Sequence, residues 1–181
     1  MIIKTQRLTL RPIELKDRIE VYKYRSNPEI SQHLSFVPES LEDVDHFITK
    51  NPKEFNLPET WFQLVIVLKE TNEVIGDIGV HFFGKEHKQI ELGYTLSSLH
   101  QNKGFASEAI EDVIDFLFTD LNKHRIVLSI DPENKASIKL AARLGFRKEG
   151  HFVKSLFFKN QWVDDVVYVL LKEDWLTAKY V

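Results

Sequence analysis

The feature that most constrains this fold is the loop at residues 101–106, which lies between a strand pattern and a helix pattern. Residues 90–96 alternate polar and apolar side chains, as a half-buried strand does. Beyond the loop, apolar residues recur at helical spacing as far as residue 117. The start of such a helix offers unpaired backbone N–H groups to an anion, and Gly104 lets the anion approach closely. The sequence therefore predicts a strand, a loop and a helix. The loop is either a phosphate-binding site or an ordinary turn, which is what a lone glycine before a helix usually marks.

A second strand, loop and helix follow directly. Residues 125–130 form a strand pattern, residues 131–134 form a loop, and a helix continues through Ile138, Ala141 and Ala142. We expect this helix to end at Gly145, because glycine readily takes the left-handed conformation that closes a helix. Two such units favour a mixed sheet with helices on both faces.

The order and spacing of these units resemble the GNAT superfamily of acyl-CoA-dependent N-acetyltransferases. The resemblance spans nearly the whole chain and extends to the RimJ/RimL-like branch, which modifies ribosomal-protein N-termini. It rests on these segments: 5–12, 91–94, 124–126, 134–137, 144–146 and 162–168, with Trp175 closing the pattern. It implies a single domain over residues 1–181, acetyl-CoA as acyl donor, and a primary amine such as a peptide N-terminal α-amine as acceptor.

The implied architecture is an α+β GNAT fold, a three-layer α/β/α arrangement of about seven mostly antiparallel strands and about four helices. The patterns predict the first two helices at residues 17–27 and 38–51, the second opened by Ser40 as N-cap. The predicted strands are 7–12, 61–69, 74–83, 90–96, 125–130, 152–158 and 163–171.

The resemblance also implies a cofactor site. The CoA pyrophosphate would be held by the loop backbone, at Gln101, Asn102, Lys103, Gly104, Phe105 and Ala106. The pantetheine arm would lie beside Tyr94, Thr95 and Leu96, because a bound chain can borrow main-chain hydrogen bonds as an added strand does. The plainer alternatives are a solvated Lys103 and an ordinary strand with a paired neighbour.

Glu91 is the candidate general base, acting directly or through water. It shares a strand face with Gly93 and Thr95. A carboxylate on a central strand is costly unless it is paired or faces a cavity. The alternative is that Glu91 forms an ion pair with an arginine such as Arg11.

Asn134 and Ser137 have two interpretations. As residues at the start of a helix they can be caps, for which asparagine is well suited. The resemblance instead places Asn134 on the pantetheine amide and Ser137 near the thioester sulfur. Many relatives carry a tyrosine as the acid at the position of Ala141, so Ser137 takes that role here. Trp162, Asp164, His81 and the side chain of Tyr94 are expected to serve packing more than the acceptor pocket.

Composition excludes several classes of function. A net charge of −3 disfavours nucleic-acid binding and suits a cationic amine. Without cysteine there is no disulfide, no thiolate zinc site and no acetyl-cysteine intermediate, so direct transfer is expected. The seven histidines show no metal-ligand spacing, and we expect no metal. No apolar run approaches the roughly 20 residues of a membrane span, and we expect a cytoplasmic protein, monomeric or homodimeric.

Two other functions remain open at this point. One is acetylation of a small molecule such as a polyamine, an antibiotic or an amino acid, which a narrow acidic cleft would favour over an open peptide groove. The other is non-catalytic binding of acyl-CoA, suggested by Ala141 at the tyrosine position.

Overall fold

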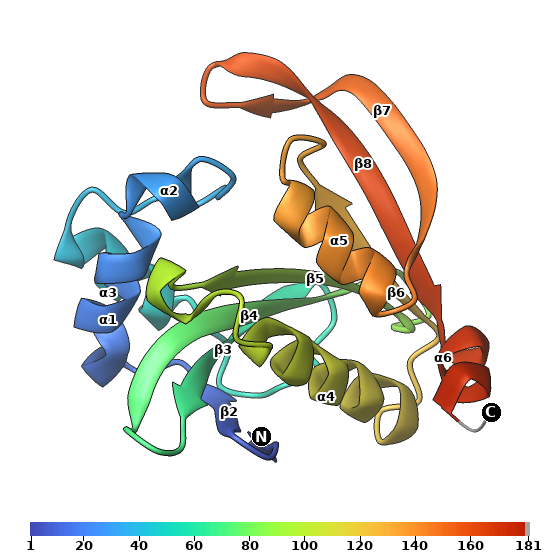
Figure 1. The fold of residues 1–181 in the computed structure, drawn as a ribbon, viewed down its shortest axis with the longest axis horizontal. Coiled ribbons are helices and arrows are strands. Elements are labelled where there is room, and N and C mark those ends of the chain that lie inside the picture. Colours follow the sequence, from blue (N-terminus) through green and yellow to red (C-terminus); the bar gives the residue numbers. More distant parts are fainter. Residues whose placement is uncertain (180–181) are drawn as a thin grey trace.

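A computed structural model describes residues 1–179 of the chain. It contains one eight-stranded sheet with the strand order β1-β2-β3-β4-β5-β6-β8-β7 (Figure 1). Every neighbouring pair is antiparallel except β5 and β6, which run parallel. The strands are β1 Ile3–Lys4, β2 Leu8–Pro12, β3 Thr60–Leu68, β4 Glu73–Phe83, β5 Gln89–Leu96, β6 Arg125–Ile130, β7 Arg147–Phe158 and β8 Gln161–Leu171.

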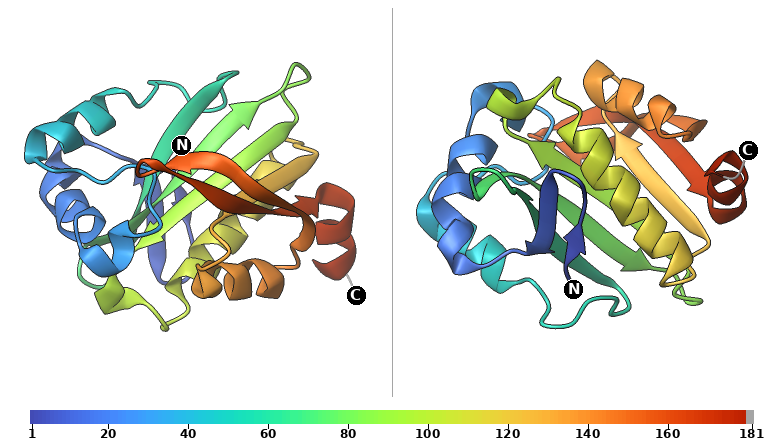
Figure 2. Two further views of the ribbon diagram at one scale, coloured as in Figure 1. Left: turned by 90° about the horizontal axis from the view of Figure 1, so that it is seen from above. Right: turned by 60° about the horizontal axis from the view of Figure 1, so that its bottom comes forward.

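Helices cover both faces of this sheet, as Figures 1 and 2 show. The α-helices are α1 Arg18–Arg25, α2 Pro28–Ser31, α3 Leu41–Thr49, α4 Phe105–Thr119, α5 Lys135–Arg143 and α6 Lys172–Lys179. Two short 3-10 helices, η1 Leu15–Asp17 and η2 Ser98–His100, precede α1 and the loop before α4. The predicted three-layer α+β architecture is confirmed.

Alternation along β3 explains the two hydrophobic layers. Leu64 and Ile66 face the main core with α4 and α5, whereas Val65 and Val67 face a smaller core with α1 and α3. Successive side chains of a strand point to opposite faces, so an unbroken apolar run is what a strand covered on both sides requires. The stripe of apolar residues on α4 fills the main core, as its periodicity predicts.

The structure has more elements than the sequence predicts. The additional ones are short or polar, namely β1, α2 and α6, so they carry little periodic signal. Strand β7 begins at Arg147 instead of residue 152, because its first half is a mostly exposed ribbon without a buried face. Ser40 does cap α3, and Gly145 is left-handed at φ +84°, as predicted.

The sheet splits between β5 and β6. Their parallel pairing covers only Gln89–Arg125, Ile90–Ile126 and Glu91–Val127. Beyond Glu91, β5 continues to Leu96 alongside β4, while β6 continues to Ile130 alongside β8. The two strands at the centre of the sheet therefore part at Glu91.

Strands β7 and β8 form a long ribbon that rises past α5 (Figure 1). Its turn consists of Lys159 and Asn160. Both have positive φ, as in the two-residue hairpin turns whose backbone matches the twist of the strands.

Among residues 1–179, no helix has the length and apolar character that crossing a bilayer requires.

Candidate active site

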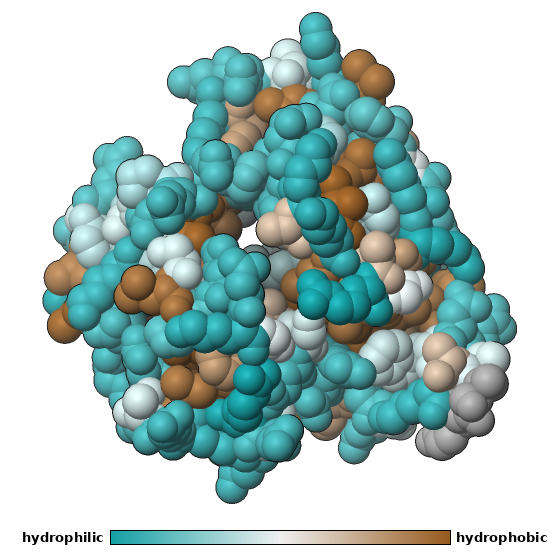
Figure 3. All heavy atoms as spheres, in the orientation of Figure 1, coloured by the Kyte–Doolittle hydropathy of each residue, from teal (hydrophilic) through white to brown (hydrophobic). Residues whose placement is uncertain are grey.

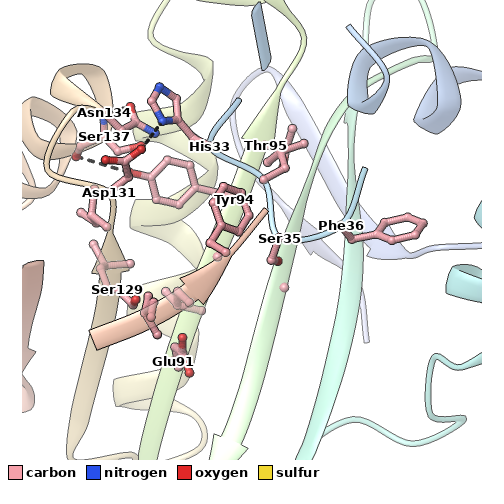
Figure 4. Close-up of a pocket in the computed structure, with 18 of the residues that line it drawn as sticks. His33, Ser35, Phe36, Glu91, Tyr94, Thr95, Ser129, Asp131, Asn134 and Ser137 are labelled. Carbon is pink, nitrogen blue, oxygen red and sulfur yellow. Dashed lines mark hydrogen bonds and ion pairs between the residues drawn. The ribbon is translucent and has the colours of Figure 1, made fainter. Parts of the chain in front are cut away.

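A cleft of about 820 Å³ opens where β5 and β6 part. Its walls come from β3 to β6, the segment after α2, the start of α5 and the tip of the β7–β8 ribbon. Figure 3 shows the molecule hollowed near the centre of this face, and Figure 4 shows side chains that line the cleft.

A row of side chains across three strands contains Glu91. Trp61, His81 and Glu91 are cross-strand neighbours, and the rings of Trp61 and His81 stack with centroids 4.7 Å apart. The Glu91 carboxylate is 34% exposed and lines the cleft, and its Oε2 lies 3.4 Å from His81 Nδ1. Arg11 is not its partner, because Arg11 pairs with Asp17 at 2.7 Å. Glu91 thus faces a cavity with a nearby imidazole and no guanidinium.

Two facing glycines leave space beside this row. Gly79 and Gly93 are cross-strand partners next to His81 and Glu91. A Cβ on Gly79 would lie 3.1 Å from the Trp61 ring and 2.9 Å from the Gln63 amide, so this position has no room for a side chain. At Gly93 the nearest atom would be 4.0 Å away, which leaves the cleft open next to Glu91.

One wall of the cleft is held by a buried ion pair. Arg25 binds Asp77 through two hydrogen bonds of 2.6 and 2.8 Å, and Tyr24 Oη donates to the same carboxylate at 2.6 Å. Burial, with the Asp77 charge, raises the pKa of Tyr24 well above its ordinary value. Arg25 also donates to the Phe36 carbonyl at 3.2 Å. The pair therefore fixes the segment after α2 against β4.

Two contacts cross the mouth of the cleft. His33 Nδ1, after α2, lies 2.7 Å from Asp131 Oδ2, after β6 (Figure 4). Lys159, at the tip of the ribbon, donates to the Ser31 carbonyl at 2.9 Å. Because they join opposite walls, these contacts bridge the mouth of the cleft at two points.

The ribbon contributes two adjacent carboxylates with different surroundings. Asp164 accepts hydrogen bonds from the Lys154 N–H at 2.9 Å and from His151 at 2.7 Å, and both lower its pKa. It thereby stabilises the left-handed Lys154, in line with the packing role expected for it. Asp165 is 8% exposed, lines the cleft and accepts from Ser129 Oγ at 2.8 Å. Sequence reasoning missed Asp165, because nothing local distinguishes it from Asp164.

The loop before α4 has the backbone of an anion site. Asn102 and Gly104 are left-handed, at φ +59° and +81°, and no side chain caps the first turn of α4. Such a turn aims consecutive N–H groups into one concavity, and the diphosphate of CoA fits this arrangement. The side chains of Gln101 and Lys103 form hydrogen bonds inside the protein, in which Gln101 donates to the Leu96 carbonyl and Lys103 to the Leu99 carbonyl. Phe105 is buried and Ala106 packs against the core.

Arg7 is a further residue at this loop that sequence reasoning did not single out. Its guanidinium donates to the Lys103 carbonyl at 3.0 Å, pairs with Glu108 at 2.6 Å and lies 4.4 Å above the Phe105 ring. The side chain is 43% exposed, so it places a positive charge next to the anion site. No local signal marks Arg7, because it comes from the residue before β2, far away in the chain.

The other predicted cofactor residues lie on both sides of the split, with Tyr94, Thr95 and Leu96 on β5 and Asn134 and Ser137 at the start of α5. Asn134 caps α5 by accepting from the Ser137 N–H at 3.1 Å, so the cap uses the backbone of Ser137 and not its hydroxyl. That hydroxyl has no partner within residues 1–179. Tyr94 points toward it (Figure 4), its Oη is 3.4 Å from the Ser137 carbonyl, and burial raises its pKa. Thr95 is buried on β5, and Ala141 is fully buried.

No set of three or more acidic or histidine side chains in residues 1–179 is arranged to hold a metal ion.

Comparison with protein families and curated proteins identifies relatives. The model of the acetyltransferase (GNAT) domain matches residues 7–147. The uncharacterized N-acetyltransferase p20 of Bacillus licheniformis is 36% identical over 171 residues, covering 94% of this chain and 96% of p20. A ribosomal protein uS5 alanine N-acetyltransferase of Escherichia coli is 39% identical over 88 residues, covering 49% of this chain and 45% of that protein.

Solved structures match over nearly the full length. A GNAT-family acetyltransferase from Bacillus anthracis superposes with a TM-score of 0.86 and 30% identity, covering 96% of this chain and 99% of that one. Spermidine N-acetyltransferase from Vibrio cholerae, in complex with CoA and spermine, superposes with a TM-score of 0.80 and 26% identity, covering 94% and 98%.

Proposed function

Because this chain belongs to the acetyltransferase (GNAT) domain family and is an N-acetyltransferase, we propose that its acceptor is a small cationic amine. Acetyltransferases of this family use acetyl-CoA. The observation that carries the proposal is the acceptor cleft, which is bridged across its mouth by the His33–Asp131 and Lys159–Ser31 contacts. Five carboxylates and three cationic side chains line it, and the remaining surplus of two negative charges favours a positively charged guest. An acidic cleft that is bridged across its mouth suits a small amine better than a protein chain.

The Vibrio cholerae spermidine enzyme matches over almost all of both chains, whereas the ribosomal-protein enzyme matches over about half. The extent of these matches supports a small amine over a protein N-terminus as the acceptor.

The residues around the split provide the chemistry of transfer. Acetyl-CoA supplies the acyl group as an activated thioester. An alkyl amine resembles the lysine amine, whose pKa is about 10.4, so it arrives protonated and needs a base. Glu91 accepts that proton, directly or through water, and the neutral nitrogen forms the new C–N bond as the C–S bond breaks. Backbone N–H groups of β5 beyond Glu91 stabilise the oxyanion. The nitrogen loses its second proton once the C–N bond has formed, and the Ser137 hydroxyl relays that proton to the leaving thiolate, so that Ser137 ends as it began.

The cofactor would lie at the split between β5 and β6, on the face of the sheet that is covered by α4 and α5. Its diphosphate would be bound by the backbone of residues 101–106, with Arg7 adjacent. Tyr94, Thr95 and Leu96 on β5 and Asn134 on α5 would border the pantetheine arm. The absence of cysteine supports direct transfer between two bound substrates.

A peptide N-terminal α-amine is the second candidate acceptor. The partial similarity to the uS5 alanine N-acetyltransferase favours it. An α-amino group has a pKa of about 8, so roughly a tenth of it is neutral at pH 7, far more than of a lysine-like amine, and a weaker base suffices. This candidate requires the tip of the ribbon to move away from α2.

One experiment separates the possibilities. The protein is incubated with acetyl-CoA and a panel of diamines, monoamines, amino acids and peptides with free N-termini, and products are measured by mass spectrometry. Acetylated small amines without acetylated peptides support the proposal. Acetylated peptides alone would establish the second candidate. Tight CoA binding without any acetylated product would instead indicate a non-catalytic acyl-CoA-binding protein.

A further inference from the structure

The five carboxylates that line the cleft differ in whether a nitrogen-bearing side chain pairs with them. Four of them have a nitrogen partner: Asp77 with Arg25, Asp131 with His33, Asp164 with His151, and Glu91 with the more distant His81. The fifth, Asp165, has no cationic partner within residues 1–179, although it is only 8% exposed. Within residues 1–179 its side chain accepts one hydrogen bond, from the neutral hydroxyl of Ser129 to Oδ1. Oδ2 is left for the cleft.

Burying a carboxylate without a counter-charge is costly, and the cost is repaid when a cation binds. Asp165 is therefore an incomplete ion pair that faces a cavity of substrate size. We propose that Asp165 and Ser129 form a subsite for a second ammonium group of the acceptor, distinct from the nitrogen that is acetylated. This inference rests on the proposed function and specifies its substrate class as amines with two separated positive charges.

Strand register places this subsite on the same side of the sheet as Glu91. Val127 is the parallel partner of Glu91, and Ser129 follows two residues later, so both side chains face the same way. Ser129 is paired with Val167 on β8, two residues from Asp165. Figure 4 shows Ser129 and Glu91 on opposite sides of the split.

The spacing of the two carboxylates explains why they bind different nitrogens. Strand β6 lies between β5 and β8, and Asp165 lies four residues beyond Val169, the β8 residue in register with Glu91. With about 4.8 Å between neighbouring strands and about 3.3 Å per residue along a strand, the Cα atoms of Glu91 and Asp165 are roughly 16 Å apart. A single ammonium group cannot contact both. The reacting nitrogen must lose its proton beside Glu91, whereas a nitrogen held by Asp165 gains from keeping its charge. An acceptor with several methylenes between two amines can satisfy both requirements.

Asp165→Asn tests the subsite, because asparagine keeps the shape and still accepts from Ser129 while the charge is removed. The matched control is Asp164→Asn, which alters the neighbouring carboxylate that supports the ribbon. For each protein, kcat and KM are measured with a straight-chain monoamine and with the terminal diamine of the same length, over several lengths. The wild type should prefer the diamine. In Asp165→Asn the KM for diamines should rise roughly tenfold, with kcat and the monoamine constants nearly unchanged. Asp164→Asn should retain the preference.

The outcomes distinguish this inference from the proposed function. If wild type acetylates monoamines and diamines but Asp165→Asn keeps the diamine preference, the subsite is wrong and the small-amine function stands. If wild type acetylates no small amine, the proposed function itself fails. Should Asp165→Asn fold poorly by circular dichroism, Asp165→Glu replaces it: the longer side chain should shift the best diamine to a shorter one, and an unchanged optimum would overturn the subsite.

Discussion

The cofactor loop and the acceptor cleft are built in different ways. The proposed cofactor loop is one continuous stretch, residues 101–106, and its proposed anion site consists of backbone N–H groups aimed by two left-handed residues. The cleft is assembled from segments as distant as Arg25 and Asp165, and its properties come from side-chain charges. A site made of backbone tolerates most side chains provided that its conformation is kept. A site made of side chains depends on each group and on the fold that brings the groups together.

The largest effect is expected at the acceptor side, for Glu91→Gln. Glutamine keeps the shape but cannot accept a proton, so kcat should fall roughly 10²–10⁴-fold while CoA affinity is unchanged. Steady-state kinetics over pH 6–9 and CoA titration measure this. Glu86→Gln, in the exposed turn before β5, is the control. A near-normal kcat across this range would mean that another group is the base.

The next effect concerns the ion pair that holds the cleft wall. Asp77→Asn leaves the buried Arg25 without its counter-charge, which should cost about 3–5 kcal/mol of unfolding free energy. Urea denaturation measures it. Glu20→Gln removes an exposed partner of Lys23 and should cost under about 1 kcal/mol. Similar losses for the two variants would contradict the importance of burial at this wall.

On the cofactor side, the sensitive position is a glycine. Gly104→Val should weaken acetyl-CoA binding by about 1–3 kcal/mol, because a branched side chain strains φ +81° and would stand close to Arg7. Gly84→Val is the control, since Gly84 has a similar φ of +86° in a remote turn. If both variants fold and bind CoA as the wild type does, the loop is not the diphosphate site.

Ser137→Ala should have a smaller effect, lowering kcat on the order of tenfold, because water can replace the hydroxyl as proton donor. Stability should hardly change, since the cap of α5 uses the Ser137 backbone N–H. Asn134→Ala, by contrast, should lose about 1 kcal/mol of stability through the lost cap. Full activity of Ser137→Ala would remove the hydroxyl from the mechanism.

The smallest effect is a pH dependence at the cofactor loop. Burial acts to raise the pKa of Glu108, but hydrogen bonds from Thr5 and Arg7 outweigh it and lower the pKa. A carboxyl whose pKa is lower in the folded state stabilises that state above its unfolded pKa, and the contribution disappears as pH falls through the folded pKa. The stability difference between wild type and Glu108→Gln should therefore shrink in acid. A difference that is constant with pH would contradict this role.

The sequence determined the parts of this protein that depend on near neighbours. Strand alternation before residue 97, the helical stripe after residue 104 and the closing Gly145 each involve a few adjacent residues, and all appear in the structure. The same local patterns, through their resemblance to a known superfamily, led to the acetyltransferase family. The sequence also showed that Glu91 needs either an ion-pair partner or a cavity, because a carboxylate on a central strand is costly otherwise.

Only the tertiary structure decided which distant side chains meet. Ser129 and Asp165 are 36 residues apart, Arg25 and Asp77 are 52 apart, and His33 and Asp131 are 98 apart. Strand register and the split at Glu91 bring these pairs together, and neither is visible in a local pattern. This is why Arg11 was a reasonable but wrong partner for Glu91, and why Asp165 could not be told from Asp164. Periodicity reports which way a side chain faces, but what it faces depends on the packing of the whole chain.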